Sequence, residues 1–177
     1  MKYLPAIFLS MAIVGVLGGC VAQQYKIPVT APFNAEEAKI ALQPGNNTVK
    51  GSAMLGALLR RSEGEAVTCA GKPIHIAPVT TYSKARMMSL YDNDNAGYNP
   101  ALNGRRLDES VNFWMEGARE TTCDAQGYFT FENLKDGEYY VSSQIVWLEQ
   151  TLPEGGVLMK KVSVRGGETK EIVLSGY

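Results

Sequence analysis

The sequence predicts an all-β domain, a seven-stranded β-sandwich that carries a short helix and a polar insertion. Alternating apolar and polar residues recur in short runs, and turns that contain Gly or Asp separate these runs at close spacing. The expected strands run from residue 48 to the turn at 62–64, and then over 72–79, 118–123, 127–132, 138–148, 157–164 and 169–174. The sandwich domain is expected over 47–177, with the insertion at 80–117.

The N-terminus has the layout of a secretion signal. Lys2 supplies a positive charge, and an almost unbroken apolar run covers Leu4–Leu17. This run is shorter than the roughly 20 residues that a membrane-spanning helix needs. The four residues Leu17–Cys20 read Leu-Gly-Gly-Cys and resemble the lipobox of bacterial lipoproteins. The alternative is an ordinary signal peptide cut at another small residue, such as Ala22.

The lipobox resemblance implies that residues 1–19 are removed and that acyl chains on Cys20 hold the protein in the bacterial cell envelope. Val21 stands where an aspartate would resemble an inner-membrane retention signal, which favours the outer membrane, on its periplasmic or its outer face. Residues 20–46 are then expected to form the lipid anchor and an extended tether, because Pro28 and Pro32 interrupt a stretch with few apolar pairs. A short helix over 36–42, capped by Asn34, is expected within it.

Composition limits the function further. Removal of residues 1–19 leaves 158 of the 177 residues, enough for one domain. One of the 17 basic residues leaves with the signal, so against 18 acidic residues the mature chain has a net charge of −2, without the basic surplus of a nucleic-acid binder. With Cys20 carrying lipid, Cys69 and Cys123 are expected to form a disulfide in an oxidising compartment. Closing about 55 residues contributes roughly 3 to 4 kcal/mol. Two buried free thiols are the alternative.

A family resemblance lies in the second half of the chain. Residues 122–141 read Thr-Cys-Asp-Ala-Gln-Gly-Tyr-Phe-Thr-Phe-Glu-Asn-Leu-Lys-Asp-Gly-Glu-Tyr-Tyr-Val. They resemble the hairpin T-D-x-x-G-x-F-x-F-x-x-L-x-x-G-x-Y-x-V of carboxypeptidase regulatory-like, transthyretin-type (prealbumin-like) β-sandwiches. Residues 71–76, Gly-Lys-Pro-Ile-His-Ile, resemble the strand that reads G-x-P-V-x-V in such domains. The resemblance implies a Greek-key sandwich, from which the helix and polar insertion at 80–117 depart.

No catalytic residue, metal site or cofactor is predicted. A Ser/His/Asp arrangement would need His75, the only histidine, and the chain has no G-x-S-x-G motif. Residues 92–97 begin like a calcium loop, but Ala96 and Asn103 stand where two further ligands are needed. A pair of carboxylates could act on a glycosidic bond, although their clustering in one polar loop is explained by solubility. These carboxylates are Asp92, Asp94, Asp108, Glu109 and Glu116.

The predicted function is a structural or protein-interaction module within an envelope assembly. Large amphipathic side chains, a type enriched at protein contacts, gather in the insertion, where a short helix is expected over 80–91 and a long exposed loop over 92–112. The candidate interaction residues are Tyr82, Tyr91, Tyr98, Arg105, Arg106, Phe113 and Trp114. Two alternatives stay open: the rings cover the open side of the sandwich, or exposed rings with Asp and Asn side chains bind carbohydrate. The expected partners are the membrane and an envelope protein, without nucleic acid.

Overall fold

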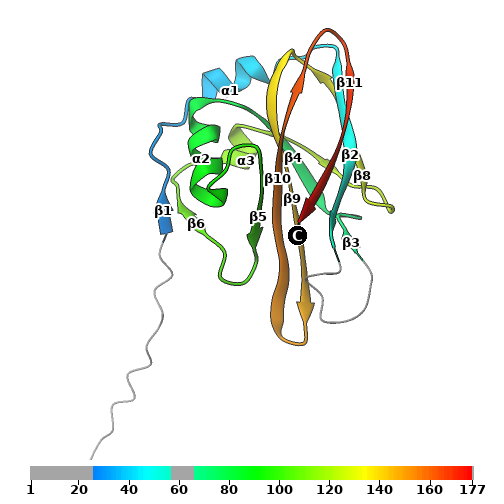
Figure 1. Cartoon of the computed structure of the whole chain (residues 1–177). Helices are drawn as coiled ribbons and strands as arrows, with labels where there is room; N and C mark the ends of the chain where they lie inside the picture. The colour runs from blue at the N-terminus through cyan, green and yellow to red at the C-terminus, as the bar shows by residue number, and fades with distance from the viewer. Residues whose placement is uncertain (1–25, 57–65, 177) are drawn as a thin grey trace, which may run out of the picture.

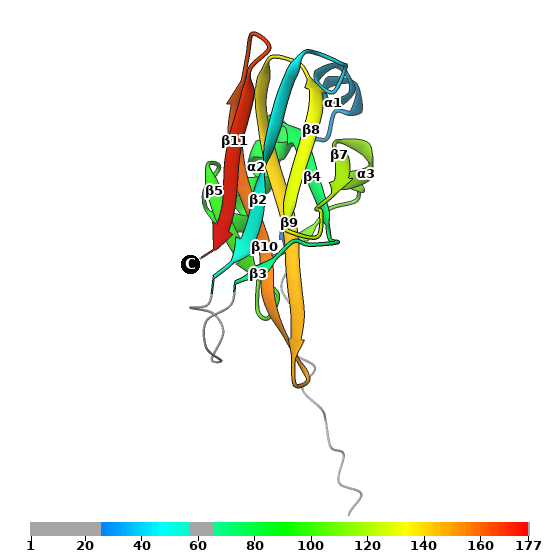
Figure 2. The same cartoon turned by 90° about the vertical axis from the view of Figure 1, so that its right-hand side faces the viewer.

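A computed structural model describes residues 26–56 and 66–176 of the chain as two β-sheets packed face to face (Figures 1 and 2). Within these residues, a five-stranded sheet has the order β5 (Ala96–Pro100), β10 (Leu152–Val164), β9 (Gly137–Glu149), β4 (Pro73–Pro78) and β7 (Arg119–Thr122). A four-stranded sheet has the order β11 (Thr169–Gly176), β2 (Asn47–Leu55) and β3 (Val67–Thr68), and β8 (Tyr128–Leu134) pairs with β2 beside β3. The predicted β-sandwich class is confirmed, but in the described residues its two sheets hold nine strands where seven were predicted, because β3 and β5 also pair into them. No helix in the described part of the chain is both long and apolar enough to cross a membrane.

Two further strands of the described residues, β1 (Lys26–Pro28) and β6 (Arg106–Asp108), form a separate two-stranded sheet. The helices are α1 (Ala35–Ala41), α2 (Thr81–Tyr91) and α3 (Phe113–Glu116). The later part of the predicted first strand, from Ala57 onward, lies outside the described residues.

Alternation along the strands builds the main core between the two sheets. On β9, Tyr139, Val141 and Ile145 are buried and belong to this core, together with residues of β2, β4, β8, β10 and β11. The residues at even positions of β9, from Tyr140 to Val146, point to the outer face of the five-stranded sheet, because successive side chains of a strand alternate in direction. The predicted disulfide between Cys69 and Cys123 is confirmed; its Cα atoms lie 5.8 Å apart, and both cysteines are buried in the main core.

A second core lies on the outer face of the five-stranded sheet, where α2 and α3 cover it (Figure 2). Tyr140 of β9 and Met159 of β10 supply its floor, and Met87 of α2 packs on them. We call this cluster the outer core. Its buried members are Ala77, Tyr82, Met87, Phe113, Tyr140 and Met159, with Val29, Phe33, Val79, Tyr91, Val111, Trp114 and Ala118 partly buried against it.

The structure corrects the predicted tether from Lys26 onward. Strand β1 pairs in parallel with β6, and Phe33 packs against the outer core. Helix α1 follows as expected, and the Asn34 side chain caps it by accepting hydrogen bonds from the backbone N–H groups of Glu36 and Glu37, both 3.1 Å. Residues 26–41 therefore belong to the folded domain, because apolar side chains between the prolines find partners in the insertion.

The long exposed loop predicted over 92–112 is also corrected, because part of it completes the sheet. Strand β5 pairs with β10 from Gly156↔Pro100 to Lys160↔Ala96 and forms an edge of the five-stranded sheet. Strand β6 pairs with β1, which holds the rest of the insertion against the domain. A β carbon at Gly97 would lie 2.5 Å from the ring of Tyr91, so the glycine lets α2 and β5 approach closely.

Candidate functional site

Two of the predicted interaction residues are buried, and their place in an interaction face is therefore wrong. Tyr82 and Phe113 belong to the outer core, and Phe113 is only 3% exposed. Their ring centroids lie 5.7 Å apart, and the ring of Phe33 meets that of Tyr82 edge-on at 5.2 Å. Because these rings bury one another, a binding partner cannot contact them. They cover the sheet, as one of the sequence alternatives stated.

A buried ion pair holds the helix and the insertion together. Arg86 of α2 is 7% exposed and donates hydrogen bonds to both carboxylate oxygens of Glu109, at 3.1 Å from Nε to Oε2 and 3.0 Å from Nη2 to Oε1. The Tyr82 hydroxyl donates to the same carboxylate at 2.7 Å. Burial and this carboxylate raise the pKa of Tyr82. Glu109, one of the carboxylates considered for glycoside chemistry, is thus bound within the protein.

His75 lies in a row of polar residues that the outer core covers. Its register partners on the neighbouring strands are Glu120 and Ser142, and its Nδ1 lies 3.5 Å from the Glu120 carboxylate. Trp114 stacks on the imidazole with ring centroids 4.8 Å apart. Ser142 is buried and donates its hydroxyl to the carbonyl of Leu158 at 2.9 Å. This serine is therefore held away from any substrate that would approach from solvent.

Burial lowers the pKa of His75. The Glu120 carboxylate acts in the opposite direction and the Arg86 guanidinium in the same direction, with a net lowering. The folded domain therefore favours the neutral imidazole. Trp114 covers one side of this imidazole, and the Arg86 guanidinium lies 4.8 Å from the centroid of the same indole. Trp114 of α3 is thus held in place as a half-buried part of the layer that covers the sheet.

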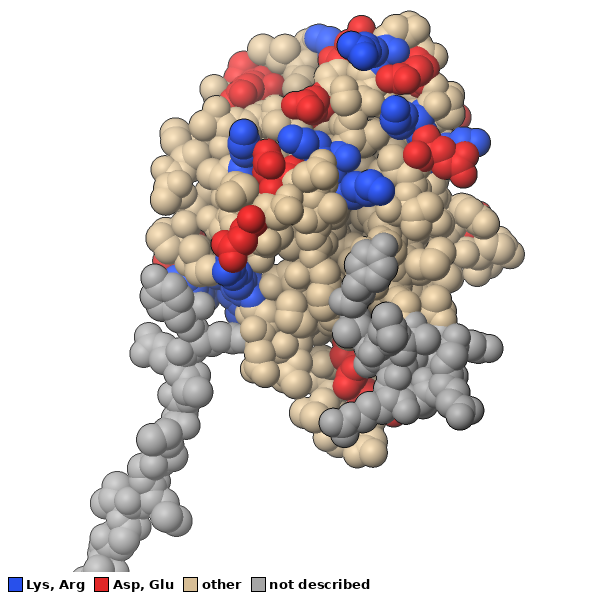
Figure 3. Space-filling view, in the orientation of Figure 1, with Lys and Arg blue, Asp and Glu red and all other residues tan. Residues whose placement is uncertain are grey.

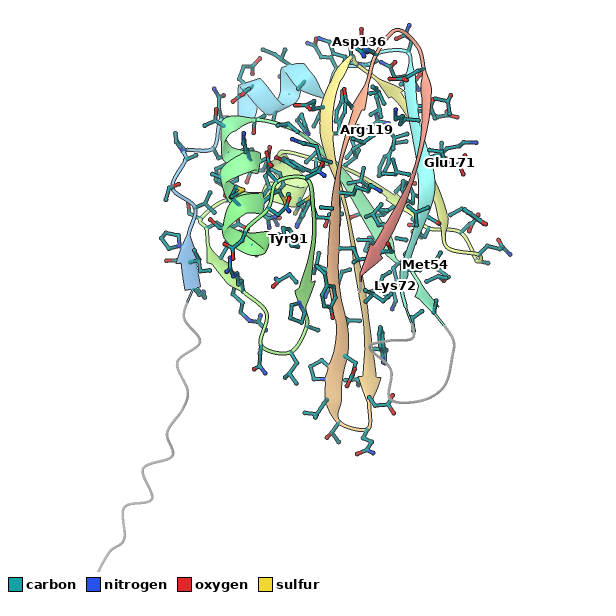
Figure 4. All side chains as sticks on the ribbon, viewed as in Figure 1. Met54, Lys72, Tyr91, Arg119, Asp136 and Glu171 are labelled. Atoms are coloured by element: carbon teal, nitrogen blue, oxygen red, sulfur yellow. A yellow bond between two sulfur atoms is a disulfide. The ribbon has the colours of Figure 1, made fainter. Side chains whose placement is uncertain are left out.

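Three further predicted interaction residues have structural contacts. The ring of Tyr91, the last residue of α2, packs against Gly97 of β5 (Figure 4), and burial raises the pKa of Tyr91 to about 12. Tyr98 packs against the main core and donates its hydroxyl to the carbonyl of Gly155 at 2.8 Å. Arg105 pairs with Asp92 and donates to the carbonyl of Ser89 at 3.2 Å, which fastens the loop after β5 to the end of α2.

The acidic turn with the calcium-like spacing is occupied by the protein's own groups. Asp92 pairs with Arg105, and hydrogen bonding to this guanidinium lowers the pKa of Asp92. Asp94 lies 3.4 Å from the Lys161 ammonium and 3.6 Å from that of Lys84. In residues 26–56 and 66–176, no three His, Cys, Asp or Glu side chains are grouped so that they could hold a metal ion.

The uncovered half of the outer sheet face offers a different surface. Beyond the outer core, two hollows of about 290 Å³ and about 220 Å³ adjoin each other, and both are bordered by Gln144 and Val146 of β9. We call this surface the open face. The larger hollow is lined by Asn99, Pro100, Ala101, Gly104, Arg105, Arg106, Gln144, Val146, Pro153 and Val157, and the smaller one by Lys72, Pro73, Gln144 and Val146.

The wall of the larger hollow is held by local hydrogen bonds. The side-chain amide of Asn99 donates to the carbonyl of Arg105 at 2.9 Å and accepts from the N–H of Arg105 at 2.8 Å. A β carbon at Gly104 would lie 2.0 Å from the carbonyl oxygen of Pro100, so only glycine allows this tight return of the chain. The loop therefore presents Arg106 at a fixed place beside the sheet.

Two polar side chains on the open face are not used by the fold. The amide of Gln144 and the guanidinium of Arg106 are exposed, and neither makes a hydrogen bond or an ion pair with another residue of the described ranges. Val146, Val157 and Pro153 supply half-buried apolar area beside them. Figure 3 shows acidic and basic side chains interspersed on the face in view, without a single-sign field. The open face thus suits a ligand that combines apolar area with hydrogen-bond acceptors.

Sequence reasoning identified Arg106 but missed Gln144. The signal available was the outward series of β9, which changes from Tyr140 and Ser142 to Gln144 and Val146. An aromatic ring at an outward position indicates a covered sheet, and an isolated amide indicates an uncovered one. To use this signal, one must know which residues of β9 face outward and which part of that face the insertion covers. The alternation in the sequence does not provide the second piece of information.

No protein-family model matches the chain, and no curated protein matches it. A solved structure from Pseudomonas aeruginosa, described as a "putative carbohydrate binding protein", is similar in fold, with a TM-score of 0.65 and 23% sequence identity. The alignment covers 82% of this chain and 99% of that protein. The likeness thus extends over nearly the whole of the other domain. At this identity it establishes a shared fold.

Proposed function

We propose that this chain is a non-catalytic binding module of the bacterial cell envelope, anchored by lipid on Cys20. In this proposal the domain is a transthyretin-type, carboxypeptidase regulatory-like Greek-key sandwich, and its ligand lies on the open face. The observation that carries the proposal is the pair of uncommitted polar side chains, Gln144 and Arg106, at the edges of two adjoining hollows. The anchor rests on the Leu-Gly-Gly-Cys sequence at residues 17–20, which lies outside the described residues.

The ligand that best fits this face is an extended segment of another envelope protein. Val146, Val157 and Pro153 can accept apolar side chains, and two hollows side by side suit two neighbouring side chains of one segment. Gln144 offers both a donor and an acceptor to the backbone of such a segment, and Arg106 offers donors to a carbonyl or a carboxylate. Few side chains supply the affinity in this arrangement, as is usual at protein interfaces.

Carbohydrate is the second candidate ligand. It is favoured by the amide and guanidinium groups, which can bond sugar hydroxyls, and by the description of the similar Pseudomonas aeruginosa protein. Against it stands the lining of the hollows, which contains no aromatic ring among the described residues. Sugar rings commonly stack on such aromatic faces. A glycan array probed with the mature chain separates the two ligands, because only the second candidate predicts a signal.

The test of the protein-binding proposal is crosslinking in membranes followed by mass spectrometry. The double change Gln144→Ala with Arg106→Ala should reduce partner recovery strongly. The matched control is Gln126→Ala with Arg165→Ala, which removes an exposed glutamine and an exposed arginine from turns elsewhere in the domain. Equal recovery of a partner by the wild type and both double variants would show that the open face is not the binding surface.

A further inference from the structure

The turn that joins β9 to β10 carries apolar side chains that the fold does not use. Leu148 is 73% exposed and Leu152 is 55% exposed. Leu148 is the register partner of Pro153, and Leu152 is that of Glu149. We call residues 148–152 the hairpin tip. Register partners share a face of a hairpin, so Leu148 and Leu152 lie on its opposite faces, and each face of the tip carries one exposed leucine. Single exposed leucines are ordinary on soluble proteins, but a hairpin end that is apolar on both faces needs an explanation.

The hairpin tip projects from the body of the domain. The last pair between β5 and β10 is Gly156↔Pro100, so β10 continues four residues beyond its neighbour to Leu152. At about 3.3 Å per residue this projection measures roughly 13 Å. Figure 1 shows the tip as the part of the described domain furthest from α1. A flat surface that meets this end of the molecule touches the tip first.

The position of β1 brings this end towards the membrane. Strand β1 begins at Lys26 and leads towards the end of the domain that carries α1, so the chain enters from the side on which the tip projects (Figure 1). This orientation towards the membrane rests on the proposed lipid anchor at Cys20. Only five residues lie between Cys20 and Lys26, and the six steps from one to the other span at most about 20 Å. The bilayer therefore lies within a short distance of the described domain.

We infer that the hairpin tip rests in the headgroup region of the bilayer, with Leu148 and Leu152 against the outermost acyl carbons. Glu149 lies within the tip as the partner of Leu152, and Glu154 lies just beyond it; their carboxylates stay among the hydrated headgroups, which limits the contact to a shallow one. The anchor confines the domain to the membrane surface, so a contact that is weak by itself becomes persistent. The open face then stands directly above the bilayer, since Gln144 lies four residues before Leu148 on β9.

Depth-dependent fluorescence quenching tests this contact. The lipidated mature chain is reconstituted in vesicles of phosphatidylethanolamine and phosphatidylglycerol that contain brominated acyl chains. One variant carries Leu152→Trp, and its matched control carries Ile40→Trp on α1, at the opposite end of the domain, where the isoleucine is 48% exposed. Both variants keep Trp114 and Trp147. We expect the bromines to quench the Leu152→Trp variant more than the control, with a blue shift of its emission on vesicles.

The outcomes separate the contact from the anchor. Flotation of the vesicles reports whether the lipidated chain is membrane-bound. Vesicles that float with the protein but quench both variants equally would overturn the contact at the hairpin tip and leave the anchor in place. A mature chain that carries no acyl mass and does not float would overturn the anchor, and the contact with it. Circular dichroism of both variants verifies that the sandwich is folded.

Discussion

The two halves of the outer sheet face differ, although the same strands build both. Tyr140 and Gln144 point outward from β9 only four residues apart, yet Tyr140 is buried in the outer core and Gln144 is exposed on the open face. The insertion accounts for the difference, because α2 and α3 reach only one half of the sheet. Aromatic residues concentrated in an insertion can therefore mark where a sheet is covered. The half that α2 and α3 leave uncovered, with the loop after β5 as its wall, becomes the candidate binding surface.

In the covered half, the insertion supplies both a buried positive charge and the carboxylate that neutralises it. Arg86 enters the outer core from α2, and a buried guanidinium requires a partner and hydrogen-bond acceptors. Glu109 supplies both from the segment that follows β6. On the open face, Arg106 is solvated and needs no such partner. Substitutions in the covered half should therefore lower the free energy of unfolding, whereas substitutions on the open face should weaken binding.

Phe113→Ala should have the largest effect on stability. Removal of this buried ring leaves a cavity between α3 and the sheet and should cost about 3 to 5 kcal/mol of unfolding free energy. Val146→Ala on the open face, where the side chain is half-buried, should cost about 1 kcal/mol or less. Urea unfolding followed by circular dichroism measures both values. Similar losses for the two variants would remove the contrast between the covered and the open half.

Glu109→Ala should follow, because it leaves the Arg86 charge buried without its partner. The expected loss is about 3 kcal/mol, since one member of a largely buried pair is removed. Asp92→Ala, which breaks the exposed pair with Arg105, serves as the control and should change the unfolding free energy little. The same unfolding measurement applies. If both variants unfold alike, Glu109 does not carry the coupling between α2 and the insertion.

Trp114→Ala should lower stability by about 2 kcal/mol, because the indole is half-buried and stacks on His75. This expectation differs from the interpretation of Trp114 as part of an exposed interaction face. Thermal unfolding and partner recovery are measured on the same variant. If the variant melts at the same temperature as the wild type but no longer recovers the partner, Trp114 belongs to the binding surface.

His75 should make the covered half sensitive to acid. Its pKa is lowered in the folded state, mainly by burial, so the unfolded chain binds more protons just below its ordinary pKa of 6.5. The contribution of His75 is complete above that value and is lost as the pH falls from it towards the lowered pKa of the folded state. Unfolding free energies at pH 7.5 and pH 5 should therefore differ more for the wild type than for His75→Gln. Equal differences would contradict the shift.

Gln144→Ala should have the smallest effect on stability, within about 0.5 kcal/mol, because its amide makes no bond with the described fold. Its effect should lie in binding. Partner recovery from membranes is expected to fall while the urea midpoint stays unchanged, and Gln126→Ala should change neither. A loss of stability comparable to that of Trp114→Ala would show that Gln144 belongs to the structure of the domain.

The sequence predicted the sandwich, the disulfide and α1 because these depend on local patterns. Alternation marks the strands, and the described residues hold two cysteines, which have each other as partners. Asn34 is a cap whose bonds reach only two and three residues along the chain. Such features need little tertiary information. The same holds for β4, where Pro78 ends the strand as its missing N–H requires.

The outer core could not be predicted in this way, because it depends on pairings between distant segments. Phe33 and Tyr82 meet only after β1 pairs with β6, and β5 becomes an edge strand only by pairing with residues 156–160 of β10. Periodicity does not reveal β5 and β6 within 92–112, because both strands are short and lie among polar residues, and β6 is largely exposed to solvent. The site was misplaced for the same reason: exposure of an aromatic ring depends on packing that periodicity does not report.

The most direct test of the account is a photo-crosslinking amino acid at position 144 of the full-length chain, compared in living cells with the same group at positions 114 and 126. The account predicts an adduct with an envelope component from position 144 on the open face. No adduct is expected from the turn at position 126 or from the covered ring position 114. An adduct from position 114 with none from position 144 would place binding on the insertion and contradict the account.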